Sequence, residues 1–183
     1  MKKIEILLAT FNGENYLEAL LESIASQTYS DWVLSVADDG SSDGTVEILK
    51  KFQNKFKDRV FIKVNATRMG ASENFMNLMA SIKLDLVAFC DQDDIWRPGR
   101  LESARTHSNS DVHCVNYCVD GKSQFPALHR RTTSSTLLRN FVPGCCMSGK
   151  SMYLLDIICR LPDSVIYDHA LLYLSLSAGG NVT

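Results

Sequence analysis

The first half of the chain alternates between two hydrophobic patterns. Three segments carry apolar residues at the spacing of an amphipathic helix: Glu14–Ala25, Thr45–Phe56 and Ser72–Ile82. Short apolar runs precede, separate and follow them, at Ile4–Ala9, Trp32–Ala37, Val60–Val64 and Leu84–Cys90. Because neighbouring parallel strands need a crossover between them, this alternation predicts an α/β fold, a mostly parallel sheet with helices on both faces. Such an arrangement is typical of a nucleotide-binding half-domain.

The second half is less regular. Pro98 is placed to open a helix that reaches about His107, and Asp111–Val119 alternates like a strand. The polar residues 121–133 predict a loop or hairpin. Further apolar segments predict a short strand and two helices, within Asn140–Ser148, Ser151–Arg160 and Tyr167–Ser177. At ~100–200 residues per domain, residues 1–183 are expected to form a single domain.

Composition excludes several classes of protein. Lys and Arg number 19 against 21 Asp and Glu, and the net charge of −2 gives no positive excess for nucleic acid. Mean hydropathy is −0.06, and no apolar run approaches the ~20 residues of a membrane-spanning helix. The apolar run at the N-terminus is too short for a signal peptide. We therefore expect a cytoplasmic protein.

The six cysteines contain no Cys-x-x-Cys pair. Cys114 and Cys118 fall in one predicted strand, about 13 Å apart, too far to share a metal ion. The adjacent Cys145 and Cys146 are expected on opposite faces of a strand. The sequence therefore predicts buried free thiols rather than disulfides or a zinc site.

Acidic residues follow the most continuously apolar run. Asp91, Asp93 and Asp94 place three carboxylates within four residues, where they repel one another unless a divalent cation lies among them. Ligands of open α/β sheets bind beyond the carboxyl ends of the strands, which is where these residues stand. A solvated acidic turn that caps the helix near Pro98 is the alternative, and the residues alone leave both open.

Polar residues also follow the first two runs. Asp38 and Asp39, in ADDGSSDGT, could accept hydrogen bonds from a base or from ribose, or could belong to a well-capped turn. Thr10 and Asn12 stand at the end of the first run. A glycine-rich phosphate loop is absent from the sequence, so a metal ion would have to hold the phosphates of a bound nucleotide.

These pieces together resemble a known family. The resemblance covers about residues 3 to 180 and is carried by ATFNGENYLEALLESIASQTYSDWVLSVADDGSSDGT and FCDQDDIWRPGRLE. Both stretches are similar to the family 2 inverting glycosyltransferases, and most to the rhamnosyltransferase-like branch of bacterial polysaccharide synthesis. The resemblance implies a GT-A fold, with a nucleotide-sugar-binding half at residues 1–97 and an acceptor-side half at 98–183. It also implies a Mg²⁺ or Mn²⁺ ion, a UDP- or dTDP-linked sugar donor and a saccharide or lipid-linked acceptor.

The resemblance implies roles for the donor side. Thr10 and Asn12 would line the nucleotide pocket, and Asp39, with Asp38 beside it, would contact the base. Asp91 would contact the ribose or the sugar.

It further implies the metal and acceptor sites. Asp93 would be the main metal ligand, with Asp91 as its partner in the Asp-x-Asp motif and Asp94 near enough to help. On the acceptor side, Gly144 would let a substrate approach the backbone. Trp96, assigned to the same side, would flank the donor, and the alternative is that it packs at the edge of the sheet.

The catalytic base is assigned by the resemblance to Asp168, in Tyr167-Asp168-His169. Its carboxylate would remove the proton of the acceptor hydroxyl. The alternatives are that His169 is the base, or that Asp168 is only an acid in the first turn of the last helix. Family members are usually longer, and their C-terminal acceptor-side extension, which can contact the membrane, is missing from these residues.

Two other classes of enzyme share part of this pattern. Phosphoryl transferases of the haloacid-dehalogenase type place Asp-x-Asp after the first strand and continue to a Thr, whereas Ile95 stands there in this chain. Sugar nucleotidyltransferases carry a glycine-rich signature near the N-terminus that is missing here. A truncated or inactive nucleotide-sugar-binding protein remains the non-catalytic alternative. The oligomeric state stays open.

Overall fold

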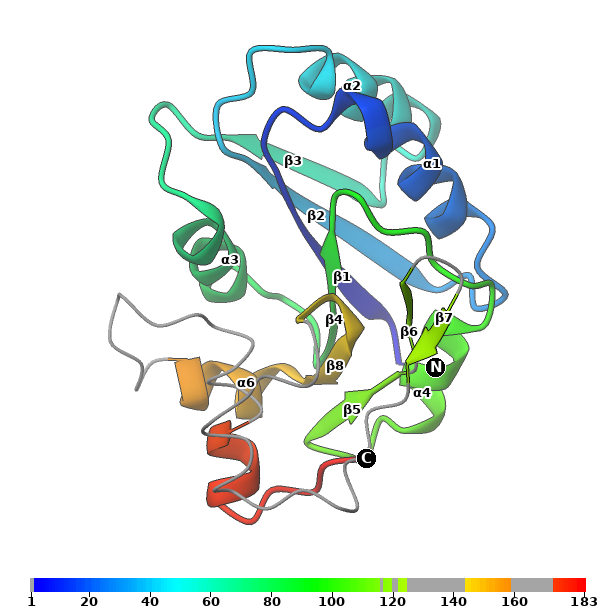
Figure 1. The fold of residues 1–183 in the computed structure, drawn as a ribbon, viewed down its shortest axis with the longest axis vertical. Coiled ribbons are helices and arrows are strands. Elements are labelled where there is room, and N and C mark those ends of the chain that lie inside the picture. The colour runs from blue at the N-terminus through cyan, green and yellow to red at the C-terminus, as the bar shows by residue number, and fades with distance from the viewer. Residues whose placement is uncertain (1, 116, 120–121, 125–143, 159–172) are drawn as a thin grey trace.

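The computed structural model describes residues 2–115, 117–119, 122–124, 144–158 and 173–183 (Figure 1). Its centre is a six-stranded sheet of order β3-β2-β1-β4-β8-β5. The strands of this sheet are β1 (Ile4–Thr10), β2 (Trp32–Asp38), β3 (Val60–Val64), β4 (Leu86–Asp91), β5 (Val112–Cys114) and β8 (Met147–Lys150). The first four strands pair in parallel, and β8 is antiparallel to both β4 and β5. The expectation of a mostly parallel sheet is confirmed.

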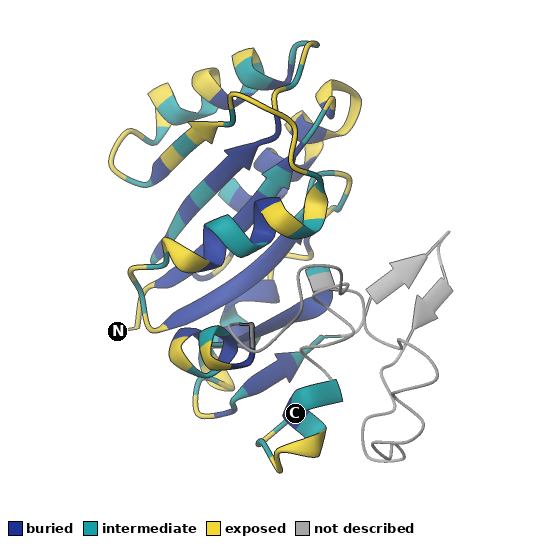
Figure 2. Ribbon diagram, turned by 90° about the vertical axis from the view of Figure 1, so that its left-hand side faces the viewer, coloured by how far each residue is buried: buried dark blue, intermediate teal, exposed yellow. Residues whose placement is uncertain are grey.

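Helices cover both faces of this sheet, with their exposed sides outward (Figure 2). They are α1 (Glu14–Ala25), α2 (Thr45–Lys55), α3 (Ala71–Ala80), α4 (Arg100–Thr106) and α6 (Ser151–Ile158). One core cluster joins α1, α2 and α4 to the sheet, and a second joins α3 and α6 to the opposite face. In β1, Ile6 and Leu8 belong to the first cluster and Leu7 to the second, because successive side chains of a strand point to opposite faces. Burial on both sides explains why the runs are continuously apolar.

The prediction of one strand over Asp111–Val119 is wrong. The stretch forms two strands in different sheets, β5 and β6 (Tyr117–Val119), and β6 pairs with β7 (Lys122–Gln124) in a hairpin. The reason lies in the partner strand. Cys114 pairs with Met147, the first residue of β8, so the pairing of β5 with β8 ends at that point. Cys114 and Cys118 therefore do not share a strand.

The prediction that Cys145 and Cys146 lie on opposite faces of a strand is also wrong. Both belong to a 3₁₀ turn, η2 (Gly144–Cys146), because β8 begins only at Met147. Their Sγ atoms are 4.0 Å apart. Among the described cysteines, Cys90, Cys114, Cys145 and Cys146 are free thiols, as expected, and Cys90 and Cys146 are buried.

The C-terminal residues return to the sheet. Residues 173–177 are helical, within the predicted last helix, and Val182 bridges to Val112 of β5 in parallel. Asp111 anchors this return, since its carboxylate accepts a hydrogen bond from the N–H of Asn181 at 3.0 Å. Within the described ranges, no helix has the length and apolar character needed to cross a membrane.

Candidate active site

The carboxyl ends of β1, β2 and β4 meet at one edge of the sheet (Figure 1). Thr10 pairs with Asp38, and Ala9 pairs with Asp91, so register brings the three predicted polar segments side by side. The parallel order of these strands is the cause, because it sends every strand end to the same edge. The residues of the predicted donor site therefore converge.

Asp38 and Thr10 make their observed contacts with the protein itself. The fully buried Asp38 carboxylate accepts hydrogen bonds from Thr10 Oγ1 at 2.8 Å, Ser41 Oγ at 2.6 Å and the Ser41 N–H at 2.9 Å. These bonds fold the Asp-Asp-Gly-Ser turn back onto the end of β1. Their predicted contacts with a nucleotide remain predictions.

Asp39 organises the loop between β3 and α3. Its carboxylate accepts hydrogen bonds from the N–H groups of Met69 and Gly70, each at 2.8 Å, and from Asn65 Nδ2 at 3.2 Å. Burial acts to raise the pKa of Asp39, but these hydrogen bonds together outweigh it and the pKa is lowered. Asp39 is therefore an ionised carboxylate at the predicted base-binding position.

Asn12 joins the loops that follow β1 and β2. Its φ of 46° lies in the left-handed region, where asparagine is more readily accommodated than most residues. Its N–H donates to Ser41 Oγ at 2.9 Å, and its Oδ1 accepts from the Ser42 N–H at 2.9 Å. Glu14, which the sequence places in the first helical turn, reaches across to accept from the Gly44 N–H at 2.7 Å.

Gln92 is a site residue that the sequence reasoning missed. Its Oε1 accepts from the Phe11 N–H at 2.9 Å, and its Nε2 donates to the Phe11 carbonyl at 3.1 Å. The Arg68 guanidinium lies 4.0 Å from the centroid of the Phe11 ring. The only signal for this contact in the sequence is the position of this amide side chain, between Asp91 and the pair Asp93 and Asp94.

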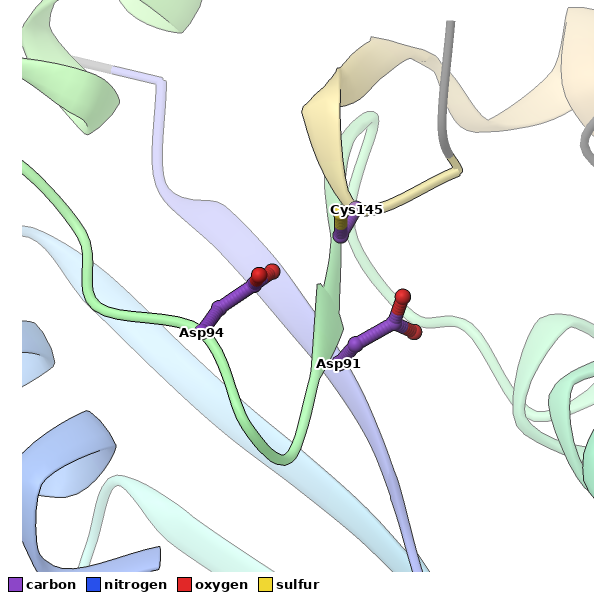
Figure 3. A group of neighbouring side chains, drawn as sticks. All are labelled: Asp91, Asp94 and Cys145. Carbon is purple, nitrogen blue, oxygen red and sulfur yellow. The ribbon is translucent and has the colours of Figure 1, made fainter. Parts of the chain in front are cut away.

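The acidic motif meets a cysteine from another part of the chain. One ligand atom each from Asp91, Asp94 and Cys145 lies within 4.8 Å of the other two (Figure 3). Burial raises the pKa of Asp94, partly offset by a hydrogen bond with Cys145. Asp93 is exposed and belongs to no such group within the described residues. The two partly buried carboxylates fit a divalent cation, whereas the role of Asp93 remains a prediction.

Arg100 supports the turn that carries Cys145. Its Nη2 donates to the carbonyl oxygens of Cys145 and Met147, at 3.3 and 3.0 Å. Its guanidinium lies 5.2 Å from the centroid of the Trp96 ring. Trp96 is only 6% exposed and belongs to the core between α1 and the sheet, so the structure places it inside the protein rather than at an open surface.

Two acceptor-side predictions remain, those for Gly144 and for the catalytic base. Gly144 opens η2, next to the residues just described. Tyr167, Asp168 and His169 lie outside the described residues, so the assignment of the base stays a prediction.

The sequence profile of Glycosyl transferase family 2 matches residues 5–158. The chain belongs to this family. Among its relatives, the dTDP-rhamnosyl transferase RfbG of Shigella flexneri is 35% identical over 160 residues, which is 81% of this chain and 55% of RfbG. A second relative in Escherichia coli, the UDP-Glc:alpha-D-GlcNAc-diphosphoundecaprenol beta-1,3-glucosyltransferase WfgD, is 29% identical over 151 residues, 78% of this chain and 57% of WfgD.

Solved structures of glycosyltransferases share the fold. That of S. aureus TarS 1-349 in complex with UDP-GlcNAc superposes with a TM-score of 0.80 at 21% identity, covering 99% of this chain and 56% of that fragment. The GT-A fold expected for this family 2 member is thereby confirmed. The chain spans about half the length of RfbG, of WfgD and of the TarS 1-349 fragment.

Proposed function

We propose that this chain transfers a sugar from a nucleotide-diphosphate-sugar to a saccharide or lipid-linked acceptor, with inversion, in bacterial cell-surface polysaccharide synthesis. One observation carries the proposal: in a family 2 chain, Asp39, Asp91 and Asp94 converge at the carboxyl edge of the sheet. Family membership favours glycosyl transfer over the phosphoryl- and nucleotidyl-transfer alternatives.

The donor is proposed to be UDP- or dTDP-linked. The names of WfgD and RfbG, which carry UDP-Glc and dTDP-rhamnosyl respectively, support these two classes without separating them. Asp39 would accept a hydrogen bond from the base, and Asp91 would contact the ribose or the sugar. The Arg68–Phe11 pair stands beside Asp39 and adds a positive charge at this edge.

A Mg²⁺ or Mn²⁺ ion, held by Asp93 and Asp91 with Asp94 near enough to help, would stabilise the charge that develops on the departing diphosphate. Asp168 would remove the proton of the acceptor hydroxyl as that oxygen attacks the anomeric carbon, with His169 as the alternative base. A single displacement of this kind inverts the configuration. We place the reaction at the cytoplasmic face of the membrane, supported by the diphosphoundecaprenol-linked acceptor in the name of WfgD.

Calorimetric titration with UDP, dTDP and GDP, with and without Mn²⁺, tests the donor site. We expect metal-dependent binding of UDP or dTDP, weakened at least about tenfold by Asp91→Asn. Asp85→Asn is the matched control, because Asp85 is an exposed acid just before the other end of β4. Equal binding by wild type and Asp91→Asn, or no binding of any nucleotide, would contradict the proposal.

Transfer is tested separately, by mass spectrometry of donor hydrolysis and of products formed with saccharide and lipid-linked acceptors. Asp168→Asn should abolish both reactions and leave nucleotide binding intact. A wild-type chain that binds donor but neither hydrolyses nor transfers it would instead be a nucleotide-sugar-binding protein.

A further inference from the structure

The η2 turn brings a thiol to the two carboxylates at the end of β4. We propose that Asp91, Asp94 and Cys145 form a mixed carboxylate–thiolate site that binds a thiophilic divalent cation of the Zn²⁺ class in preference to Mg²⁺. The site is a property of the protein alone and needs no nucleotide. It shares Asp91 with the metal site expected from the Asp-x-Asp motif, but it takes Asp94 and Cys145 in place of Asp93, the main ligand of that motif.

Geometry is the first support. The ligand atoms of Asp91, Asp94 and Cys145 all lie within 4.8 Å of one another. Ligand bonds of about 2.0–2.3 Å place the ligand atoms of a tetrahedral zinc ion about 3.3–3.8 Å apart. Small side-chain rotations would therefore close the group around an ion. Figure 3 shows that the side chains come from two segments, with Asp91 and Asp94 on one and Cys145 on the other.

The chemistry of the donors gives the selectivity. Mg²⁺ takes oxygen ligands in octahedral geometry and keeps several waters, whereas a thiolate selects zinc-like ions. Three protein ligands leave a fourth tetrahedral position open, as in zinc sites that bind water or substrate. Binding replaces the proton of the Cys145 thiol, which passes to solvent.

The surroundings hold Cys145 in place and balance the charge. Arg100 donates hydrogen bonds to the carbonyl oxygens on both sides of Cys146, those of Cys145 and Met147. Arg100 is only 7% exposed, so its charge lies within the protein beside the turn. The two carboxylates and the thiolate carry three negative charges. The ion, with two positive charges, and Arg100, with one, together balance them. Such outer contacts orient metal ligands and tune their affinity.

Cd²⁺ is the probe, because thiolate coordination produces a charge-transfer absorption in the ultraviolet that oxygen ligands do not. The reduced, nucleotide-free chain is titrated with CdCl₂, and ZnCl₂ and MgCl₂ then compete for the site. We expect the band to saturate at one equivalent, to be displaced by Zn²⁺ and to be retained in excess Mg²⁺. Cys145→Ser should abolish it, and Asp94→Asn should weaken Cd²⁺ binding at least about tenfold.

Two variants serve as matched controls. Cys146→Ser removes the neighbouring thiol, and Asp93→Asn removes the exposed acid of the same motif; both should keep the band, with circular dichroism confirming the fold of every variant. Absence of the band in wild type, its survival in Cys145→Ser or its loss in folded Cys146→Ser would overturn the proposal. Unchanged affinity in Asp94→Asn, which keeps every cysteine, would also do so. None of these results depends on glycosyl transfer.

Discussion

The side-chain amide of Gln92 pairs with the main chain of Phe11, a residue 81 positions earlier, through one hydrogen bond in each direction. This pairing ties the acidic motif after β4 to the loop after β1. Asp91 directly precedes Gln92 and Asp94 follows it by two residues, so the same bonds that fix Gln92 also fix the backbone that carries the two carboxylates. The amide therefore serves the site without needing to touch a substrate.

Removal of this pairing should cost stability. Gln92→Ala deletes two hydrogen bonds at about 0.5–1.5 kcal/mol each, so we expect the free energy of unfolding to fall by about 1–3 kcal/mol. Urea denaturation measures the change. Gln92→Glu keeps one acceptor for the Phe11 N–H, but it turns an oxygen toward the Phe11 carbonyl and adds a fourth acid to the motif, so it should also be less stable than wild type. Equal stability of Gln92→Ala and wild type would show that the pairing contributes nothing.

Gly13 is expected to be coupled to Gln92. A Cβ added at Gly13 would lie 2.4 Å from Gln92 Oε1, so Gly13→Ala must displace the amide from Phe11. In the Gln92→Ala background that obstacle is gone, and the same substitution should cost much less. A double-mutant cycle by urea denaturation measures this coupling. Additive effects of the two substitutions would contradict the expectation.

The Asp38 carboxylate is expected to be a structural necessity of the turn. Asp38→Ala leaves the buried hydroxyl of Thr10 and the two donors of Ser41 without their acceptor, which should destabilise the fold by about 3 kcal/mol or more. Thr10→Val removes only one of the three donors and should cost about 1–2 kcal/mol. Thermal unfolding ranks the two variants, and a larger loss for Thr10→Val would contradict the assignment.

Asp39 should contribute a pH-dependent part of the stability. Its pKa is lowered in the folded protein relative to the ordinary value of 3.8, so its stabilising effect is present above that pH and is lost as the pH falls through the folded pKa. Asp39→Asn should therefore be less stable than wild type at neutral pH, and the difference should shrink below about pH 4. Urea denaturation between pH 7 and pH 3 tests this, and a constant difference would exclude it.

Gly149 should tolerate no side chain. A Cβ there would lie 2.3 Å from the carbonyl oxygen of Asp111, a main-chain atom of the neighbouring segment that cannot rotate away. Gly149→Ala should destabilise the protein by about 1–3 kcal/mol, as overpacking does. Gly99→Ala is the control, because no other atom lies within 4 Å of the added Cβ. Thermal unfolding that ranks both variants equally would contradict the prediction.

Local pattern predicted the elements of the first half well. The predicted bounds Glu14–Ala25 and Val60–Val64 are those of α1 and β3, because each element has its own hydrophobic period. The same reasoning failed at Asp111–Val119, where alternation continues but the partner strand ends. Hydrophobic periodicity indicates which face of a strand is buried, but it does not indicate how far the neighbouring strand extends.

The sequence by itself determined the alternation of strands and helices, the family and the gathering of acidic residues at one edge of a parallel sheet. Only the tertiary structure decided what those residues contact. Thr10 donates a hydrogen bond to Asp38, and Gln92 forms hydrogen bonds with Phe11. Cys145 lies beside Asp91 and Asp94. Periodicity and turn chemistry act between residues near in the chain, and they can be read locally. Contacts between distant segments depend on strand order and register, which the whole core sets at once.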